Sequence, residues 1–533
     1  MYTDCDAGST WGWRFFALTL LLLPGANAVE PGADPLAALV PLETGGQQTE
    51  LGACALIIAH ALDASVDAPL YAERLDSLAS ELKPALAPAA GVEAKLATIA
   101  EFVYTHWGFA NRDLRPADVF VSFADAIDKR QWNCVSMSAL YVALGERIGL
   151  PMQLVSGHGH VLVRCDRYYV ETTQRGKVHD SVDYLSEYLP FPCLNPEDYK
   201  PVSTREAVAV LLTQTGGAVS AQGKLDFAQA CFQHALKFDP DHAEAHAALG
   251  FHFAKVGHID RAINAFHAAI RSNPKLREAY GGLGAALRAK GDLAKAAQAL
   301  RKAVELCDKQ PESMFNLGQV LYENGDLAAS IEAFRNYTAL APGDVDGYIR
   351  LAFPLEDSGQ LDEALAAYDR VLRLAPNHAD ALVNSGAILE KQNKWDAAQN
   401  KYERCIEAAP SNALAHAGMG RVLTERGDLD GAAKAFVRSI ELDSTNPATW
   451  IDFARLERKR GDTLAAIEKL NRALTINPLE PETHIELADT LLDRGEVAKA
   501  GQHAAVAKRL GATLPVALES LLPETGENTS ASP

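Results

Sequence analysis

The sequence lacks paired cysteines: its eight cysteines lie far apart along 533 residues, and no two of them form a CxxC pair. This spacing is typical of neither a zinc ribbon nor a small disulfide-stapled scaffold. Positive charge is also scarce, with 50 Lys and Arg against 69 Asp and Glu and a formal net charge of −19. Because proteins that bind phosphate backbones need a basic surface, we expect no nucleic-acid partner.

Several signature motifs are missing as well. The chain contains no GxSxG elbow and no GKS or GKT phosphate loop, which argues against a serine hydrolase, a kinase and a nucleotide-binding enzyme. The apolar run from Phe15 to Leu23 is well short of the roughly 20 residues that a membrane helix needs, and no other segment is long enough. We therefore predict neither a membrane span nor a bound cofactor.

The same apolar run follows Arg14 and leads to Ala26-Asn27-Ala28, where small residues suit a signal peptidase. We predict a signal peptide over residues 1–28 and a linker, rich in Pro, Gly and Gln, over residues 29–49. The protein is then exported, to the periplasm of a bacterium. Two aspartates near the start weaken the usual positive charge, so a frayed apolar terminus or a misassigned start is the alternative.

Composition predicts folded domains. A balance of 48% hydrophobic and 22% charged residues is globular, and the length suggests three or four folding units. Apolar residues recur at three- and four-residue intervals over residues 51–62, 70–83 and 93–108, which predicts three helices. We expect these helices to open a domain that covers residues 50–200.

Past residue 208 the chain repeats itself every 34 residues, in nine copies that span residues 209–514. The eighth position of each copy is small, the twentieth is usually alanine, the twenty-fourth is often aromatic and the thirty-second is often proline. Small residues let paired helices approach, the aromatic fills the gap to the next repeat, and proline ends the second helix. These landmarks resemble the tetratricopeptide repeat (TPR), which implies nine helix hairpins stacked into an α-solenoid.

The resemblance to TPR proteins implies a concave groove, lined by the first helix of each repeat, that binds a protein or peptide. For any single groove residue the alternative is that asparagine belongs to the repeat pattern and arginine is solvated surface. Ala504 replaces the aromatic in the last copy, as in a terminal cap, and we predict a disordered tail over residues 515–533. The candidate groove residues are Asn316, Tyr322, Arg350, Phe353, Asn384, Arg421, Arg455 and Arg458.

A different pattern occupies residues 129–176, ahead of the repeats. Asn133 is a good helix cap, apolar residues follow at helical spacing, and Gly149-Leu150-Pro151 is a stop signal. Cys134 thus falls in the first turn, where unpaired amides and the helix dipole favour thiolate over thiol. A lone cysteine is also often a small buried apolar residue, so this position alone does not identify a nucleophile.

Residues 160–171 contain two alternating β-rich runs joined by a short hairpin. If Cys165 pairs with Tyr168 across a two-residue loop, Glu171 lies diagonal to His160 on one face of the sheet. A three-residue loop would send the two side chains to opposite faces. The chain order is then a cysteine at a helix start, a histidine and a carboxylate, which suits a nucleophile, a base and an orienting acid.

This segment resembles the transglutaminase-like superfamily, whose papain-like core packs a helix that starts with the catalytic cysteine on a sheet that carries histidine and an acid. The strings NCVSMSALYVALGERIGLP, GHVLVR and VETT also resemble a bacterial branch that joins such a domain to TPR repeats. The resemblance implies Cys134 as the nucleophile, His160 as the general base and Glu171 as its partner, and we add Trp132 as an oxyanion donor from its proximity. The acid is glutamate where the wider superfamily usually has aspartate, and many branch members lack the cysteine.

The predicted fold is mainly α, with an α+β transglutaminase-like domain followed by an α-solenoid of nine TPR hairpins. The predicted function is a protein-interaction scaffold that carries a thiol site for amide hydrolysis or acyl transfer. The alternative is a non-catalytic binding and assembly scaffold with a silent transglutaminase-like domain. We predict no metal site, although His158 and His160 together with Cys134, Cys165 or His179 would suit zinc.

Overall fold

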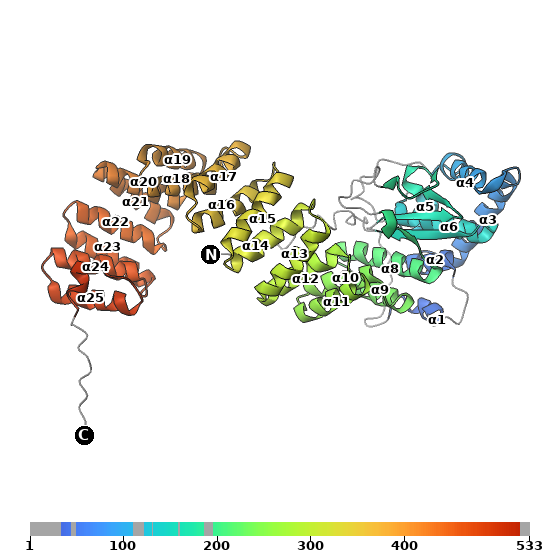
Figure 1. The fold of residues 1–533 in the computed structure, drawn as a ribbon, viewed down its shortest axis with the longest axis horizontal. Helices are drawn as coiled ribbons and strands as arrows, with labels where there is room; N and C mark the ends of the chain where they lie inside the picture. The colour runs from blue at the N-terminus through green and yellow to red at the C-terminus, as the bar shows by residue number, and fades with distance from the viewer. Residues whose placement is uncertain are drawn as a thin grey trace, which may run out of the picture. The chain divides into compact units, whose positions relative to one another are not determined.

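The chain divides into two compact units, residues 1–326 (unit 1) and residues 327–533 (unit 2). The structure, a computed structural model, describes residues 34–43, 50–109, 122–130, 132–157, 160–185 and 196–522, so the predicted signal peptide over residues 1–28 lies outside it. Within the described ranges, none of the helices combines the length and apolar character needed to cross a membrane. Figure 1 shows that both units are built mainly from helices, with the described strands gathered in unit 1.

Unit 1 opens with helices where the sequence predicts them. The three helices predicted over residues 51–62, 70–83 and 93–108 are confirmed, although the third passes into a short π-helix near its end. The leading elements are η1 (Ala37–Leu39), α1 (Val40–Glu43), α2 (Leu51–Leu62), α3 (Ala68–Leu86), α4 (Gly91–Glu101), the π-helix η2 (Phe102–His106), α5 (Phe123–Lys129) and α6 (Cys134–Ile148).

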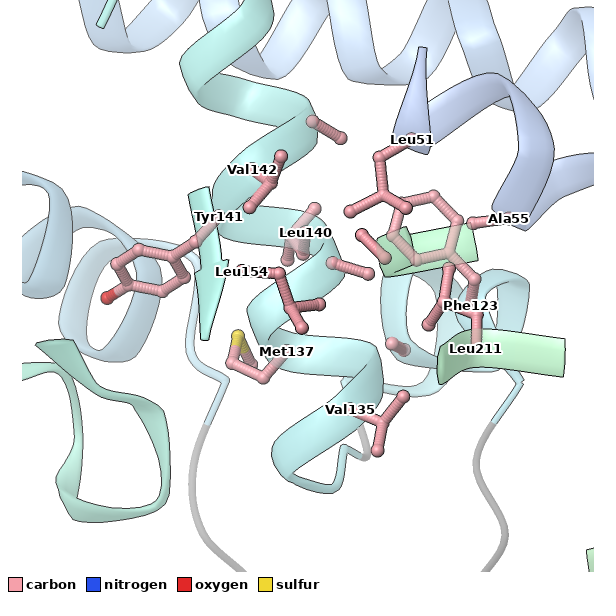
Figure 2. Close-up of a cluster of buried hydrophobic side chains, with 14 of the residues drawn as sticks. Leu51, Ala55, Phe123, Val135, Met137, Leu140, Tyr141, Val142, Leu154 and Leu211 are labelled. Carbon is pink, nitrogen blue, oxygen red and sulfur yellow. The ribbon is translucent and has the colours of Figure 1, made fainter. Parts of the chain in front are cut away.

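Helix α6 lies in the middle of the domain core and begins where Asn133 caps it. The Asn133 side chain accepts the amide N–H of Ser136 at 2.8 Å, and the Asn133 N–H donates to Ser136 Oγ at 3.1 Å. The helix ends at Gly149, whose φ of 75° suits a residue without a side chain. Figure 2 shows Tyr141 on one side of α6 and Leu51 of α2 on the other. Because α6 is packed on both sides, its first residue is carried by a buried, firmly held element.

The sheet contains five strands: β1 (Met152–Gly157), β2 (His160–Cys165), β3 (Tyr168–Glu171), β4 (Lys177–His179) and β5 (Lys200–Pro201). They lie in the order β4-β3-β2-β1-β5, and each pair is antiparallel. Cys165 pairs with Tyr168, so the predicted two-residue loop and its register are confirmed. Asp166 takes the left-handed φ of 58° that such tight turns need. Short 3-10 helices follow β3 and precede β5: η3 (Thr172–Gln174) and η4 (Pro196–Asp198).

A segment ahead of α2 is ordered where the sequence predicts a linker. Residues 34–43, the N-terminal strap, form η1 and α1 and bury Leu36 and Leu39 completely. Arg205 donates to the carbonyl oxygens of the last two strap residues at 2.9 and 2.8 Å. The linker prediction over residues 29–49 is therefore wrong for the strap, because two leucines and a guanidinium hold it against the rest of unit 1.

The repeats of unit 1 start earlier than predicted. Their first helix begins at Thr204 rather than at residue 209, because Ser203 and Glu206 form a capping box there. Leu211 of this helix belongs to the same core as α2, α5 and α6, so the predicted domain edge near residue 200 is not an edge in packing (Figure 2). The repeat helices of unit 1 are α8 (Thr204–Ala221), α9 (Leu225–Phe238), α10 (Ala243–Lys255), α11 (Ile259–Ser272), α12 (Arg277–Lys290), α13 (Leu293–Leu306) and α14 (Pro311–Glu323).

The predicted roles of the small and aromatic repeat positions are confirmed. In the second repeat the Phe266 ring is fully buried, and a β-carbon added to Gly250 would lie 2.6 Å from it. Real β-carbons do not approach that closely, so the glycine is what lets α10 and α11 pack around the ring.

Unit 2 continues the helix hairpins to the end of the described chain. Its helices are α15 (Leu327–Leu340), α16 (Val345–Asp357), α17 (Leu361–Leu374), α18 (Ala379–Lys391), α19 (Trp395–Ala408), α20 (Ala413–Arg426), α21 (Leu429–Leu442), α22 (Pro447–Lys459), α23 (Thr463–Ile476), α24 (Pro481–Asp493), α25 (Val497–Arg509) and α26 (Val516–Glu519).

The last of these helices corrects a prediction. Leu518 of α26 is fully buried in a cluster with Ala504, and Lys508 forms an ion pair with Glu519 at 3.0 Å. The disorder predicted over residues 515–533 is therefore wrong for α26, because the final repeat leaves apolar surface that Leu518 covers. Residues 523–533 lie outside the described residues.

Candidate active site

Cys134 is the first residue of α6, at the end of the helix that carries the positive side of the dipole. Its thiol is free, and the side chain is half-buried. The other free thiols of the described residues, those of Cys54, Cys165, Cys231 and Cys405, are buried. Among the free cysteines that the structure describes, Cys134 is therefore the one that lies at a helix start and is not buried.

His160 starts β2 and forms a buried pair with Glu171 at the end of β3. His160 Nε2 lies 2.8 Å from Glu171 Oε2, and the two side chains are 8% and 0% exposed. The diagonal placement predicted from the hairpin register therefore brings these groups into contact. Since Nε2 faces the carboxylate, Nδ1 is the ring nitrogen left to interact with the Cys134 thiol, which helps to raise the pKa of His160.

Glu171 is held by four hydrogen bonds. Its Oε1 accepts the Thr173 amide N–H at 3.0 Å and also the Thr173 hydroxyl. Its Oε2 is shared by His160 and the Tyr184 hydroxyl, which donates from 3.1 Å. Both carboxylate oxygens are thus satisfied inside the protein, which fixes the orientation of the acid.

The electrostatics of the site favour a charged pair. Burial acts to lower the pKa of His160, but hydrogen bonds and charge interactions with Cys134 and Glu171 outweigh it and raise the pKa to about 10. Burial acts to raise the pKa of Glu171, but His160 and Thr173 outweigh it and hold that pKa below its ordinary value. Both shifts stabilise an imidazolium beside a carboxylate.

Trp132 does not serve the site as predicted. Its side chain is buried, its indole N–H donates to the carbonyl oxygen of Phe109 at 3.4 Å, and its ring meets Tyr104 edge-on at 5.6 Å. An indole has a single N–H, and this one is directed into the core. The structure therefore does not bring Trp132 to the thiol as an oxyanion donor.

The zinc alternative is not assembled by the described residues, in which no group of three or more His, Cys, Asp or Glu side chains could hold a metal ion. His158 lies outside the described residues. Cys165 is fully buried at the other end of β2 from His160, and the His179 ring stacks on Tyr184 with centroids 3.6 Å apart.

Two residues around Glu171 escaped the sequence analysis. Thr173 lies two residues after Glu171, and this closeness in sequence is the only feature that points to it. Tyr184 lies in a short turn segment with neither helical nor strand periodicity, so no sequence pattern points to it.

The candidate groove residues all lie on first helices of their repeats. Seven of the eight are half-buried, and Arg455 is exposed. In unit 1, α14 carries Asn316 and Tyr322; in unit 2, α16 carries Arg350 and Phe353, α18 carries Asn384, α20 carries Arg421, and α22 carries Arg455 and Arg458.

Three of these arginines are tied into ion pairs between neighbouring repeats of unit 2. Arg421 contacts Glu390 at 2.8 Å and Asp452 at 3.2 Å. Arg455 contacts Asp452 and Glu486, and Arg458 continues the series to carboxylates of α24. These side chains therefore connect α18, α20, α22 and α24 rather than project as isolated solvated charges.

Comparison with known proteins identifies two regions in the chain. The model of the Transglutaminase-like superfamily matches residues 70–213, and the Tetratricopeptide repeat model matches five stretches between residues 248 and 515. A UPF0162 protein of Xylella fastidiosa (strain Temecula1) is 22% identical over 221 residues, which cover 38% of this chain and 77% of that protein.

Among solved structures, YrrB, described as a TPR protein with an unusual peptide-binding site, is 22% identical and matches 34% of this chain and 95% of its own, with a TM-score of 0.33. MamA is 24% identical and matches 31% of this chain and 96% of its own, with a TM-score of 0.30. The family matches do identify the parts: the chain carries a transglutaminase-like superfamily domain followed by tetratricopeptide repeats.

Proposed function

We propose that the transglutaminase-like domain is a thiol acyl-transfer site with Cys134 as nucleophile, His160 as general base and acid, and Glu171 as the orienting carboxylate. The observation that carries the proposal is the buried His160–Glu171 pair beside a half-buried thiol at the start of α6. A satisfied carboxylate that fixes a histidine, which in turn faces a thiol, is the arrangement that nucleophilic catalysis requires.

The reaction follows from these groups. The Cys134 sulfur, as thiolate, attacks the carbonyl carbon of an amide and forms a C–S bond, while the carbonyl oxygen takes the negative charge. In this proposal the Cys134 and Val135 amides at the start of α6, which have no intrahelical acceptor, donate to that oxygen, because the Ser136 amide is taken by the Asn133 side chain. Collapse breaks the C–N bond, and the His160 imidazolium gives its proton to the leaving amine. Water or a second amine then attacks the thioester, passes a proton to His160 and releases the thiolate.

The test is alkylation by iodoacetamide, followed residue by residue with mass spectrometry. At pH 6 we expect Cys134 of the folded full chain to react about tenfold or more faster than in denatured protein, because an unperturbed thiol is mostly protonated there. His160→Ala should abolish this advantage. Asp166→Asn, a change in the hairpin turn away from the pair, is the matched control. Labelling of native Cys134 no faster than in denatured protein would favour the silent scaffold.

We further propose that the solenoid binds a protein or peptide through the first helices of its repeats, in the periplasm of the producing bacterium. Phe353, half-buried on α16, is the probe position for a photo-crosslinking residue in the full chain. Leu464, 65% exposed on the second helix α23, is the control position. A partner captured from the periplasmic fraction at position 353 and not at 464 supports the groove, whereas equal capture at both contradicts it.

A further inference from the structure

Tyr184 is the residue that connects Glu171 to the loop after β4. Its hydroxyl donates to Glu171 Oε2 at 3.1 Å, the same oxygen that faces His160 Nε2. Its ring lies on His179, with centroids 3.6 Å apart and planes inclined by 5°. The imidazole of His179 therefore holds the phenol flat, and the phenol places its O–H on the carboxylate.

We propose that Tyr184 is a positioning residue of the thiol site, acting through Glu171 on His160 and Cys134. The inference rests on the proposed function, since positioning matters only where the thiol reacts. Tyr184 acts on the carboxylate: its hydroxyl sets which way Glu171 presents its second oxygen. That oxygen accepts from His160 and Tyr184 together, while Thr173 occupies the first.

The energetic reason is that Glu171 is completely buried, so every lost donor leaves a lone pair that water does not replace. Without the Tyr184 hydroxyl, the ionised form of the acid loses one of its four donors, while its interactions with Thr173 and His160 remain. Ionised Glu171 helps to hold His160 as imidazolium at the site. A less stable carboxylate therefore means that the active pair forms only at higher pH.

Several titratable side chains surround Glu171, and they come from different elements of unit 1. His160 on β2, His179 on β4, Tyr104 on η2 and Tyr199 next to β5 all interact electrostatically with the carboxylate. Burial holds the pKa of His179 below its ordinary value and raises the pKa of both tyrosines. His160, with a pKa of about 10, stays protonated below pH 7, so His179 is the group among these four that can change its charge in the acid range together with Glu171.

The experiment measures the pH profile of Cys134 alkylation by iodoacetamide in the full chain. Tyr184→Phe removes the hydroxyl and keeps the ring that stacks on His179. Tyr168→Phe is the matched control, because its exposed hydroxyl donates to Glu93 at the far end of the hairpin. We expect Tyr184→Phe to move the acid limb of the profile up by about half to one pH unit and to slow alkylation at pH 6 about 3- to 10-fold.

A second substitution covers the case in which Tyr184→Phe fails to fold, as judged by near-UV circular dichroism. Single-site 3-fluorotyrosine at position 184 retains the donor and makes the hydroxyl more acidic, so it should move the acid limb to lower pH; the same residue at position 168 should not. Profiles for both position-184 variants that match their position-168 controls would overturn the role of Tyr184. Failure of the proposed function is separate, since wild-type Cys134 would then react no faster than in denatured protein.

Discussion

The ring of Tyr402 occupies the space that a side chain at position 386 would need. A β-carbon added to Gly386 would lie 2.7 Å from the ring. A β-carbon on Gly418 would collide with the same fully buried ring, so Tyr402 is enclosed by α18 and α20. We expect Gly386→Ala to destabilise unit 2 by about 1–3 kcal/mol, because overpacking outweighs the roughly 1 kcal/mol that alanine gains in helix propensity.

Urea denaturation of the full chain measures this effect. Gly281 on α12 is the control, because a β-carbon there meets no atom within 4 Å, and Gly281→Ala should stabilise by up to about 1 kcal/mol. A Gly386→Ala variant as stable as wild type would mean that the ring can move aside.

The pH dependence of stability should reveal the His160–Glu171 pair. The folded pKa of His160 is raised to about 10, so its contribution is complete below its unfolded pKa near 6.5 and is lost as pH rises toward 10. The pKa of Glu171 is lowered, so its contribution is present above about 4.5 and is lost as pH falls through the folded value. The pair therefore stabilises the domain most between about pH 4.5 and 6.5.

His160→Gln removes this titration. We expect the melting temperature of wild type to exceed that of His160→Gln by a clear margin at pH 6 and by a much smaller one at pH 10, as followed by circular dichroism. A difference that stayed constant or grew with rising pH would contradict the charged pair.

The N-terminal strap should depend on His234 of α9. Its Nε2 lies 2.8 Å from Asp34 and its Nδ1 contacts Glu43, while the ring itself is 2% exposed. His234→Ala would leave both carboxylates without this partner, at a cost of about 1–3 kcal/mol. Hydrogen exchange of the Leu39 amide, which bonds within the strap, should then speed up about tenfold or more.

His246→Ala is the control for the strap, because that half-buried ring of α10 contacts the carbonyl oxygen of Pro240, which lies outside the strap. It should leave exchange at Leu39 unchanged. Equal exchange in the two variants would show that the buried leucines and Arg205 hold the strap without His234.

Arg421 should contribute more to stability than a typical surface arginine. Its partners Glu390 and Asp452 have side chains only 12% and 13% exposed, and burial already raises the pKa of Asp452 against the pull of Arg421. Arg421→Gln should raise that pKa further and destabilise unit 2 by about 1–3 kcal/mol in urea.

Arg438→Gln serves for comparison, because Arg438 and its partner Glu441 are both about half exposed. Such a pair is worth at most about 1 kcal/mol. Similar losses for the two variants would mean that the inter-repeat contacts of Arg421 add nothing beyond a surface pair.

Local rules were sufficient for the elements that carry the site. Asn133 as a cap and Gly149 as a stop locate α6, and the hairpin turn fixes the register that brings Glu171 to His160. Each of these depends on residues close in sequence, where turn and cap chemistry decides the conformation. The phase of the repeats follows in the same way from one recurring packing rule.

The remaining features depend on contacts without a local pattern. Tyr184 reaches Glu171 from a turn with no periodicity, and Trp132 is turned inward by a carbonyl group more than 20 positions earlier in the chain. The ion pairs of Arg421 do correspond to a sequence pattern. Arg421 lies 31 residues from both Glu390 and Asp452, a spacing that joins the first helices of adjacent repeats. That spacing could have been recognised in the sequence.

The double role of helix α8 affects how the protein unfolds. Leu211 and its neighbours complete the core around α6 while the same helix forms the first hairpin with α9. Melting of that hairpin would open a hole beneath the helix that presents Cys134, so the two should be lost in a single cooperative step. A fragment cut at residue 209 would divide this foldon, and neither piece would be a faithful copy of its part in the intact chain.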